Sequence, residues 1–67
     1  MGVVGVTFVN NGRMYYFNDN NLLLKKNLTV IVETEKGLQF GTVVSFIDDN
    51  LIDSNMNYKK VVRIKDD

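Results

Sequence analysis

The chain has 67 residues without cysteine or histidine, and its eight basic and eight acidic residues give a formal charge of zero. A chain this short forms one domain with a thin core. The missing residue types exclude disulfides, histidine-bound zinc and the usual nucleophilic triads. Balanced charge disfavours a dedicated nucleic-acid binder. No apolar run approaches the ~20 residues of a membrane span, and no signal peptide is recognisable. We therefore expect a cytoplasmic, non-catalytic protein without metal or membrane contact.

Short β-branched runs separated by glycine or asparagine clusters, with no proline and no helical period, predict an all-β fold. Five strands are expected, in chain order Val3–Val9, Arg13–Phe17, Leu28–Thr34, Leu38–Ile47 and Tyr58–Lys65. We predict that residues 1–67 form a single domain, a small five-stranded antiparallel SH3-like barrel or strongly bent sheet. A curled meander open at one edge is the alternative.

The first hairpin contains Asn11-Gly12, the signal for a type I′ turn with positive φ at both central residues. A two-residue loop there pairs Val6 with Phe17 and gathers apolar side chains on one face. A slip by one residue would divide them between both faces, which opposes any such slip. The apolar side chains of this predicted face are Val4, Val6, Phe8, Tyr15 and Phe17.

The second hairpin turns at Glu35-Lys36, which resists positive φ, followed by Gly37, which accepts it. A type I turn closed by a glycine bulge is therefore expected. This register pairs Val32 with Phe40 and directs Phe40 into the core. A plain two-residue loop would pair Val32 with Gln39 and scatter the apolar side chains, so we exclude it.

Two long connections separate the strands. The turn cluster at residues 18–21 is followed by residues 22–27, too short for an independent helix. We expect this segment to cross the end of the barrel and fill it with leucine. The polar connection at residues 48–57 is expected to be the most mobile part of the chain.

Tyr16 is one candidate for partner binding, because the predicted register directs it away from the apolar face. An exposed aromatic side chain on a sheet can anchor a partner. Alternatively, Tyr16 caps a second small cluster with Ile31 or Val43.

The last predicted strand is the other candidate. Basic residues alternate there with apolar ones: Lys59, Arg63 and Lys65. Lys60 instead shares the alternation of the side chains that face the core. Such a basic edge either blocks edge-to-edge aggregation or binds phosphate groups.

Six motifs follow one another along nearly the whole chain: Val4-Gly5-Val6-x-Phe8, Gly12-Arg13-Met14-Tyr15-Tyr16-Phe17, Leu24-Lys25-Lys26, Val32-Glu33-Thr34-Glu35-Lys36-Gly37, Gly41-x-Val43-Val44 and Lys59-Lys60-Val61-Val62-Arg63-Ile64. In this order and spacing they resemble the N-terminal region of the YaaT/RicT family of bacterial stage 0 sporulation proteins. The tyrosine-rich strand and the hairpin ending at Gly37 are the most specific portions. Where the family has a lysine-lysine-glycine motif, this chain has Asn27, which tolerates positive φ.

The resemblance implies that this chain is the N-terminal part of a longer regulatory protein without enzymatic activity. Such a protein acts with two small helical partners in a complex that influences RNase Y-dependent mRNA processing, sporulation, competence and biofilm formation. The iron–sulfur cysteines of the family lie outside the match, so no cofactor is expected. We expect recognition of other proteins of a regulatory complex, with a small RNA-binding β-barrel as the alternative and weak RNA binding at most. The predicted partner contacts are Tyr16, Glu33, Lys36, Lys59 and Arg63.

Overall fold

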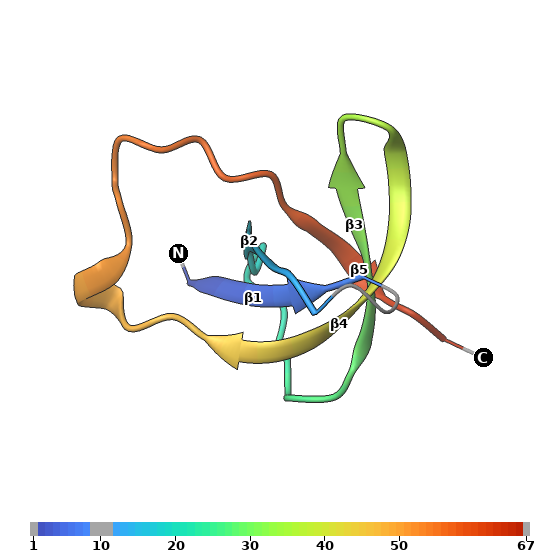
Figure 1. Ribbon diagram of the computed structural model, residues 1–67. Helices are drawn as coiled ribbons and strands as arrows, with labels where there is room; N and C mark the ends of the chain where they lie inside the picture. Colours follow the sequence, from blue (N-terminus) through green and yellow to red (C-terminus); the bar gives the residue numbers. More distant parts are fainter. Residues whose placement is uncertain (1, 9–11, 67) are drawn as a thin grey trace.

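The computed structural model describes residues 2–8 and 12–66 (Figure 1). Its elements are β1 (Val3–Thr7), β2 (Met14–Asn18), β3 (Thr29–Thr34), β4 (Gly37–Phe46), the 3₁₀ turn η1 (Asp49–Leu51) and β5 (Val61–Ile64). The all-β prediction and the order of its five strands are therefore confirmed. Within the described residues, no helix has the length and apolar character needed to span a membrane.

The five strands form one antiparallel sheet in the order β2-β1-β4-β3-β5. The long strand β4 pairs with both β1 and β3 and bends between them (Figure 1). The edge strand β2 meets the other side of the sheet through a single parallel bridge, from Asn18 to Lys60. Beside this bridge, the Asn18 amide donates a hydrogen bond of 2.8 Å to the Lys59 carbonyl. The sheet is curled but not closed.

The core lies where the inner faces of the strands meet, and it consists mainly of valine. Valine suits this position because its branched side chain packs well on a pleated surface. Of the leucines predicted to fill the end of a barrel, Leu24 is buried and Leu22 packs against the core, whereas Leu23 is exposed. The buried core residues are Val4, Val6, Phe17, Leu24, Val30, Val32, Val43 and Val61.

The first hairpin has the predicted face but not the predicted register. Val6 lies opposite Tyr15 instead of Phe17, a shift of two residues. A shift of two leaves every side chain on its own face, so the apolar face survives the error. Gly12 has the expected positive φ, 68°. The rest of the predicted turn, at residues 9–11, lies outside the described residues.

The predicted register of the second hairpin is wrong, because Thr34 pairs directly with Gly37 across a two-residue turn. The Thr34 hydroxyl donates a hydrogen bond of 2.7 Å to the Gly37 carbonyl and accepts one of 3.1 Å from the Lys36 amide. Gly37 takes the positive φ, 101°, immediately after the turn. These side-chain hydrogen bonds favour the tight turn that the alternation of apolar residues had excluded.

The corrected register moves Phe40 out of the predicted core. Val32 lies opposite Gln39, and Phe40 lies opposite Ile31 on the outer face of the sheet. Phe40 is 58% exposed there, and the Lys65 ammonium lies 5.7 Å from its ring centroid. The sheet therefore carries apolar residues on both faces.

Three asparagines provide the left-handed backbone of the connection between β2 and β3. The φ values are 57° at Asn20, 59° at Asn21 and 74° at Asn27. The Asn27 amide donates a hydrogen bond of 2.8 Å to the Val43 carbonyl and so attaches the connection to β4. Asn27 therefore adopts the positive φ that an asparagine tolerates.

The connection between β4 and β5 makes a wide loop beyond the ends of β1 and β4 (Figure 1). The Asp48 carboxylate accepts a hydrogen bond of 3.0 Å from the Asn50 amide and caps η1. Further along, the Tyr58 hydroxyl accepts a hydrogen bond of 3.2 Å from the Asp53 amide. This contact ties the loop to the segment that leads into β5.

Candidate partner-binding groove

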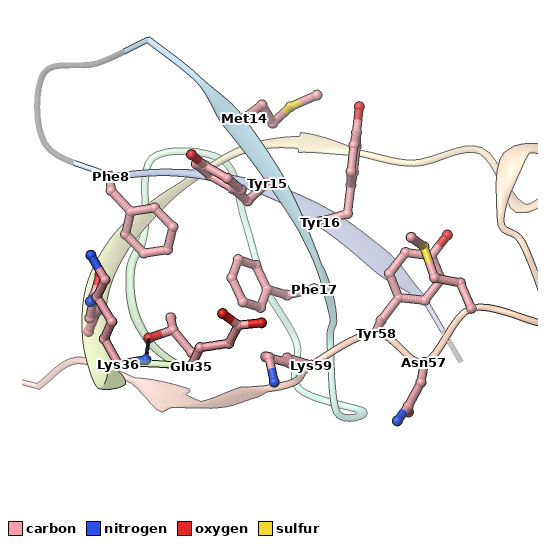
Figure 2. A pocket seen from close by; sticks show the side chains of 13 residues that line it. Phe8, Met14, Tyr15, Tyr16, Phe17, Glu35, Lys36, Asn57, Tyr58 and Lys59 are labelled. Carbon is pink, nitrogen blue, oxygen red and sulfur yellow. Dashed lines mark hydrogen bonds between the residues drawn. The ribbon is translucent and has the colours of Figure 1, made fainter.

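A groove of about 780 Å³ runs between β2 and the segment that leads into β5, and it reaches the turn between β3 and β4 (Figure 2). We call it the β2 groove. It is lined by residues 14–17, 34–36 and 56–59, together with Phe8 and Gln39.

One wall of the β2 groove is an aromatic cluster. The ring of Phe8 lies 5.5 Å from that of Tyr15 and 6.1 Å, edge to face, from that of Phe17. Phe17 belongs to the core, whereas Tyr15 is 39% exposed. The Arg13 guanidinium lies 5.9 Å from the Tyr15 ring centroid. The core thus supports an aromatic surface that faces the groove.

The opposite wall is formed by Met56, Asn57, Tyr58 and Lys59. The hydrogen bond from Asp53 restrains Tyr58 at its hydroxyl. The Lys59 carbonyl, which accepts the amide of Asn18, attaches the same wall to β2 at one end of the groove. Both walls are therefore positioned by contacts that do not depend on a ligand.

The β2 groove follows the edge of β2. Figure 2 shows Met14 and Tyr16 on one side of this strand and Tyr15 and Phe17 on the other. Successive side chains of a strand point to opposite faces. A groove lined by both sets must therefore run along the edge of the strand, where its backbone is accessible.

The charged side chains of the groove are Lys36 and Lys59, with Glu35 beside them (Figure 2). All three are exposed. The lining therefore combines aromatic surface with an excess of positive charge. In the described part of the chain, no three acidic side chains are placed to hold a metal ion.

Three of the five predicted contact residues come together in this groove: Tyr16, Lys36 and Lys59. Tyr16 is 48% exposed. The groove lining includes neither Ile31 nor Val43, which are buried elsewhere in the sheet. Partner contact by Tyr16 stays a prediction.

The two other predicted residues lie away from the groove. Glu33 pairs with Leu38, and Arg63 pairs with Ile31. Both Glu33 and Arg63 are exposed. The predicted basic edge is also divided, because Lys59 lines the groove whereas Lys65 lies over Phe40.

Sequence reasoning did not predict that Phe8, Met56 and Tyr58 line the groove. Tyr58 was expected within the last strand, which begins only at Val61. The contact between residues 56–59 and β2 joins distant parts of the chain, and no local pattern reveals it. Phe8 belongs to the predicted apolar face of the first hairpin, and part of that face lines the groove.

The chain is 37% identical over 68 aligned residues to a protein of Bacillus subtilis (strain 168) named Stage 0 sporulation protein YaaT. The alignment covers 97% of this chain and 24% of that relative, so the chain spans about a quarter of the relative's length. No protein-family model and no solved structure matches the chain.

Proposed function

The chain belongs to the YaaT family of stage 0 sporulation proteins, and we propose that it is a non-catalytic protein-interaction module of a cytoplasmic, sporulation-related regulatory protein. Its partners in this proposal are small helical proteins of a complex that acts in RNase Y-dependent mRNA processing, sporulation, competence and biofilm formation. In this proposal the module is an SH3-like barrel, in which the bridge between Asn18 and Lys60 joins the two ends of the sheet.

The β2 groove carries the proposal. It is lined by Tyr15, Tyr16 and Tyr58 and by the exposed side chain of Met56. Tyrosine and methionine are enriched at the centres of protein interfaces, where amphipathic rings bury apolar area while their hydroxyls remain hydrogen-bonded. A few such anchors supply most of the affinity of an interface.

RNA binding is the second candidate, because tyrosines beside lysines also suit stacked bases and phosphates. A nucleic-acid groove requires cations along the path of the backbone. Here Lys36 and Lys59 line the groove, but Arg63 is absent from its lining and Lys65 lies over Phe40. This division and the zero formal charge support protein recognition over RNA recognition.

The proposal can be tested in a chimera of the B. subtilis relative in which this chain replaces the aligned segment. We expect the chimera to support sporulation in cells that lack the relative. Tyr16→Ala in the chimera should reduce sporulation by at least about tenfold, as expected for loss of an interface anchor. Leu23→Ala is the matched control, because Leu23 is 85% exposed and does not line the groove.

Protein levels of all chimeras are compared by immunoblotting. If Tyr16→Ala and Tyr58→Ala both sporulate as well as the Leu23→Ala control at equal protein level, the groove is not the functional surface and the proposal fails.

A further inference from the structure

We propose that the β2 groove binds an extended, acidic segment of a partner protein, which adds to the open edge of β2 as a further strand. The inference rests on the proposed function and specifies that the partner binds through an extended, acidic segment outside its helices. It follows from the direction of the β2 backbone groups, the path of the groove and the charges along it.

The direction of the backbone groups is fixed at the end of β2. The Asn18 amide points away from β1, because it donates to the Lys59 carbonyl at 2.8 Å. The next amide, that of Asp19, points toward the β1 side and donates to the Gly2 carbonyl at 2.9 Å. In an antiparallel ladder, successive residues direct their N–H and C=O groups alternately to the two neighbours.

Met14 and Tyr16 are in phase with Asn18, so their N–H and C=O groups point to the open side of β2. Among the described residues, no backbone group on this side pairs with the amides of Met14 or Tyr16. The two intervening residues, Tyr15 and Phe17, direct their backbone groups to β1. Within the described residues, Met14 and Tyr16 therefore offer unpaired N–H and C=O groups along the groove, as a sheet edge does in strand addition.

The groove provides room for an added strand beside this edge. Its volume is about 780 Å³, and it extends from Met14 to the closed end at Asn18 and Lys59. A strand in this position would direct alternate side chains to the two sides of β2. On one side they would meet Tyr15 and Phe17, and on the other Met14 and Tyr16.

The positive charges of the groove favour binding of an acidic strand. Lys36 and Lys59 line it from two directions, and Glu35 is the acidic residue of the lining. Electrostatic complementarity favours a partner segment in which glutamate or aspartate alternates with apolar residues.

Two other occupants fit less well. A second copy of this chain would present its own β2, Met14–Asn18, which contains no acidic residue. A single strand of RNA would supply negative charge but no row of alternating N–H and C=O groups to pair with the edge. The edge and the charges together therefore favour an acidic protein segment.

The first experiment measures amide hydrogen exchange in the 67-residue chain by NMR, with and without a peptide of about eight alternating valine and glutamate residues, the length of an ordinary strand. At saturating peptide, exchange at Met14 and Tyr16 should slow by at least about tenfold, because their amides become hydrogen-bonded. The Tyr15 and Phe17 amides, which face β1, serve as internal controls and should change little. Equal protection of both sets, or of neither, would overturn the proposal.

The second experiment compares two methylated forms of the same peptide, one N-methylated at every valine and the other at every glutamate. Only one set of amides can face β2, whichever way the peptide runs. One methylated peptide should therefore lose binding while the other retains it. Retention by both would show that no backbone pairing occurs, and the inference would be wrong.

The third experiment tests charge. The double substitution Lys36→Glu and Lys59→Glu should weaken binding of the glutamate peptide by at least about tenfold. Lys25→Glu with Lys26→Glu is the matched control, since both residues are exposed and lie outside the groove lining. A valine–lysine peptide or oligouridylate that binds more tightly than the glutamate peptide would contradict the inference. The proposed function would survive that result if Tyr16→Ala still impaired the chimera.

Discussion

Gly41 of β4 lies so close to Val6 of β1 that a methyl group on Gly41 would collide with the Val6 Cγ1 atom. The same methyl group would lie 3.2 Å from the Thr7 carbonyl oxygen. Val6 is fully buried and Thr7 presents backbone, so neither can move aside cheaply. We predict that Gly41→Ala destabilises the fold by ~1–3 kcal/mol, the usual effect of overpacking.

Urea denaturation checks this prediction, with Gly12→Asn as the control. Gly12 has a φ of 68° and nothing within 4 Å of a Cβ, and asparagine tolerates this conformation. A Gly41→Ala variant as stable as the Gly12→Asn variant would show that β1 and β4 are not packed as described.

Truncation to alanine should destabilise the fold strongly at Phe17 and only slightly at Phe40. Phe17 is 5% exposed and Phe40 is 58% exposed. Phe17→Ala should cost ~3–5 kcal/mol, which is comparable to the whole stability of so small a core. Phe40→Ala should change stability by less than ~1 kcal/mol, as is usual for surface substitutions.

The two variants are compared by the dispersion of their amide NMR spectra and by thermal denaturation. We expect Phe17→Ala to be unfolded and Phe40→Ala to keep a native spectrum. The reverse result would restore the register in which Phe40 faces the core.

Asn27 offers a test of backbone strain, because its φ is 74°. Glycine adopts this conformation freely, whereas alanine is strained in it. Asn27→Gly should therefore leave the free energy of unfolding nearly unchanged, and Asn27→Ala should reduce it by ~1 kcal/mol or more. Chemical denaturation of both variants supplies the measurement, and identical stabilities would contradict the explanation by strain.

Tyr16→Ala should impair partner binding more than the double substitution Lys59→Glu with Arg63→Glu. An aromatic anchor contributes desolvated apolar area, whereas Arg63 lies outside the groove. Isothermal titration with the purified partner, at low and high salt, measures both effects.

RNA binding by the same chain should be weak and should fall steeply with salt. If the chain binds RNA tightly and the charge reversals abolish that binding, RNA recognition replaces protein recognition as the favoured function.

The strands were predictable because their signals are local. Runs of β-branched or aromatic residues and turn residues marked all five strands, and the face of the first hairpin followed from alternation. The second hairpin was not predictable by the same rule. Alternation assumes one apolar face, whereas Ile31 and Phe40 lie together on the outer face. The hydrogen bonds of the Thr34 hydroxyl decided the turn instead.

The groove was predictable only in part. Tyr16, Lys36 and Lys59 could be selected one by one, by exposure and charge. Their proximity depends on the bridge between Asn18 and Lys60, which joins distant segments of the chain. No pattern within either segment specifies this contact. The sequence therefore indicated candidate contact residues but not which of them share a surface.

The pairing of β1 with β4 also has a kinetic consequence. Val4 pairs with Phe46 and Thr7 with Thr42, so this ladder closes a loop that contains both β2 and β3. Hairpins form in roughly 1–10 μs, but such distant pairing must first overcome the entropy of loop closure. We expect refolding to be limited by this step and to take milliseconds or longer. The chain contains no proline, so refolding should lack the slow phase of prolyl isomerisation.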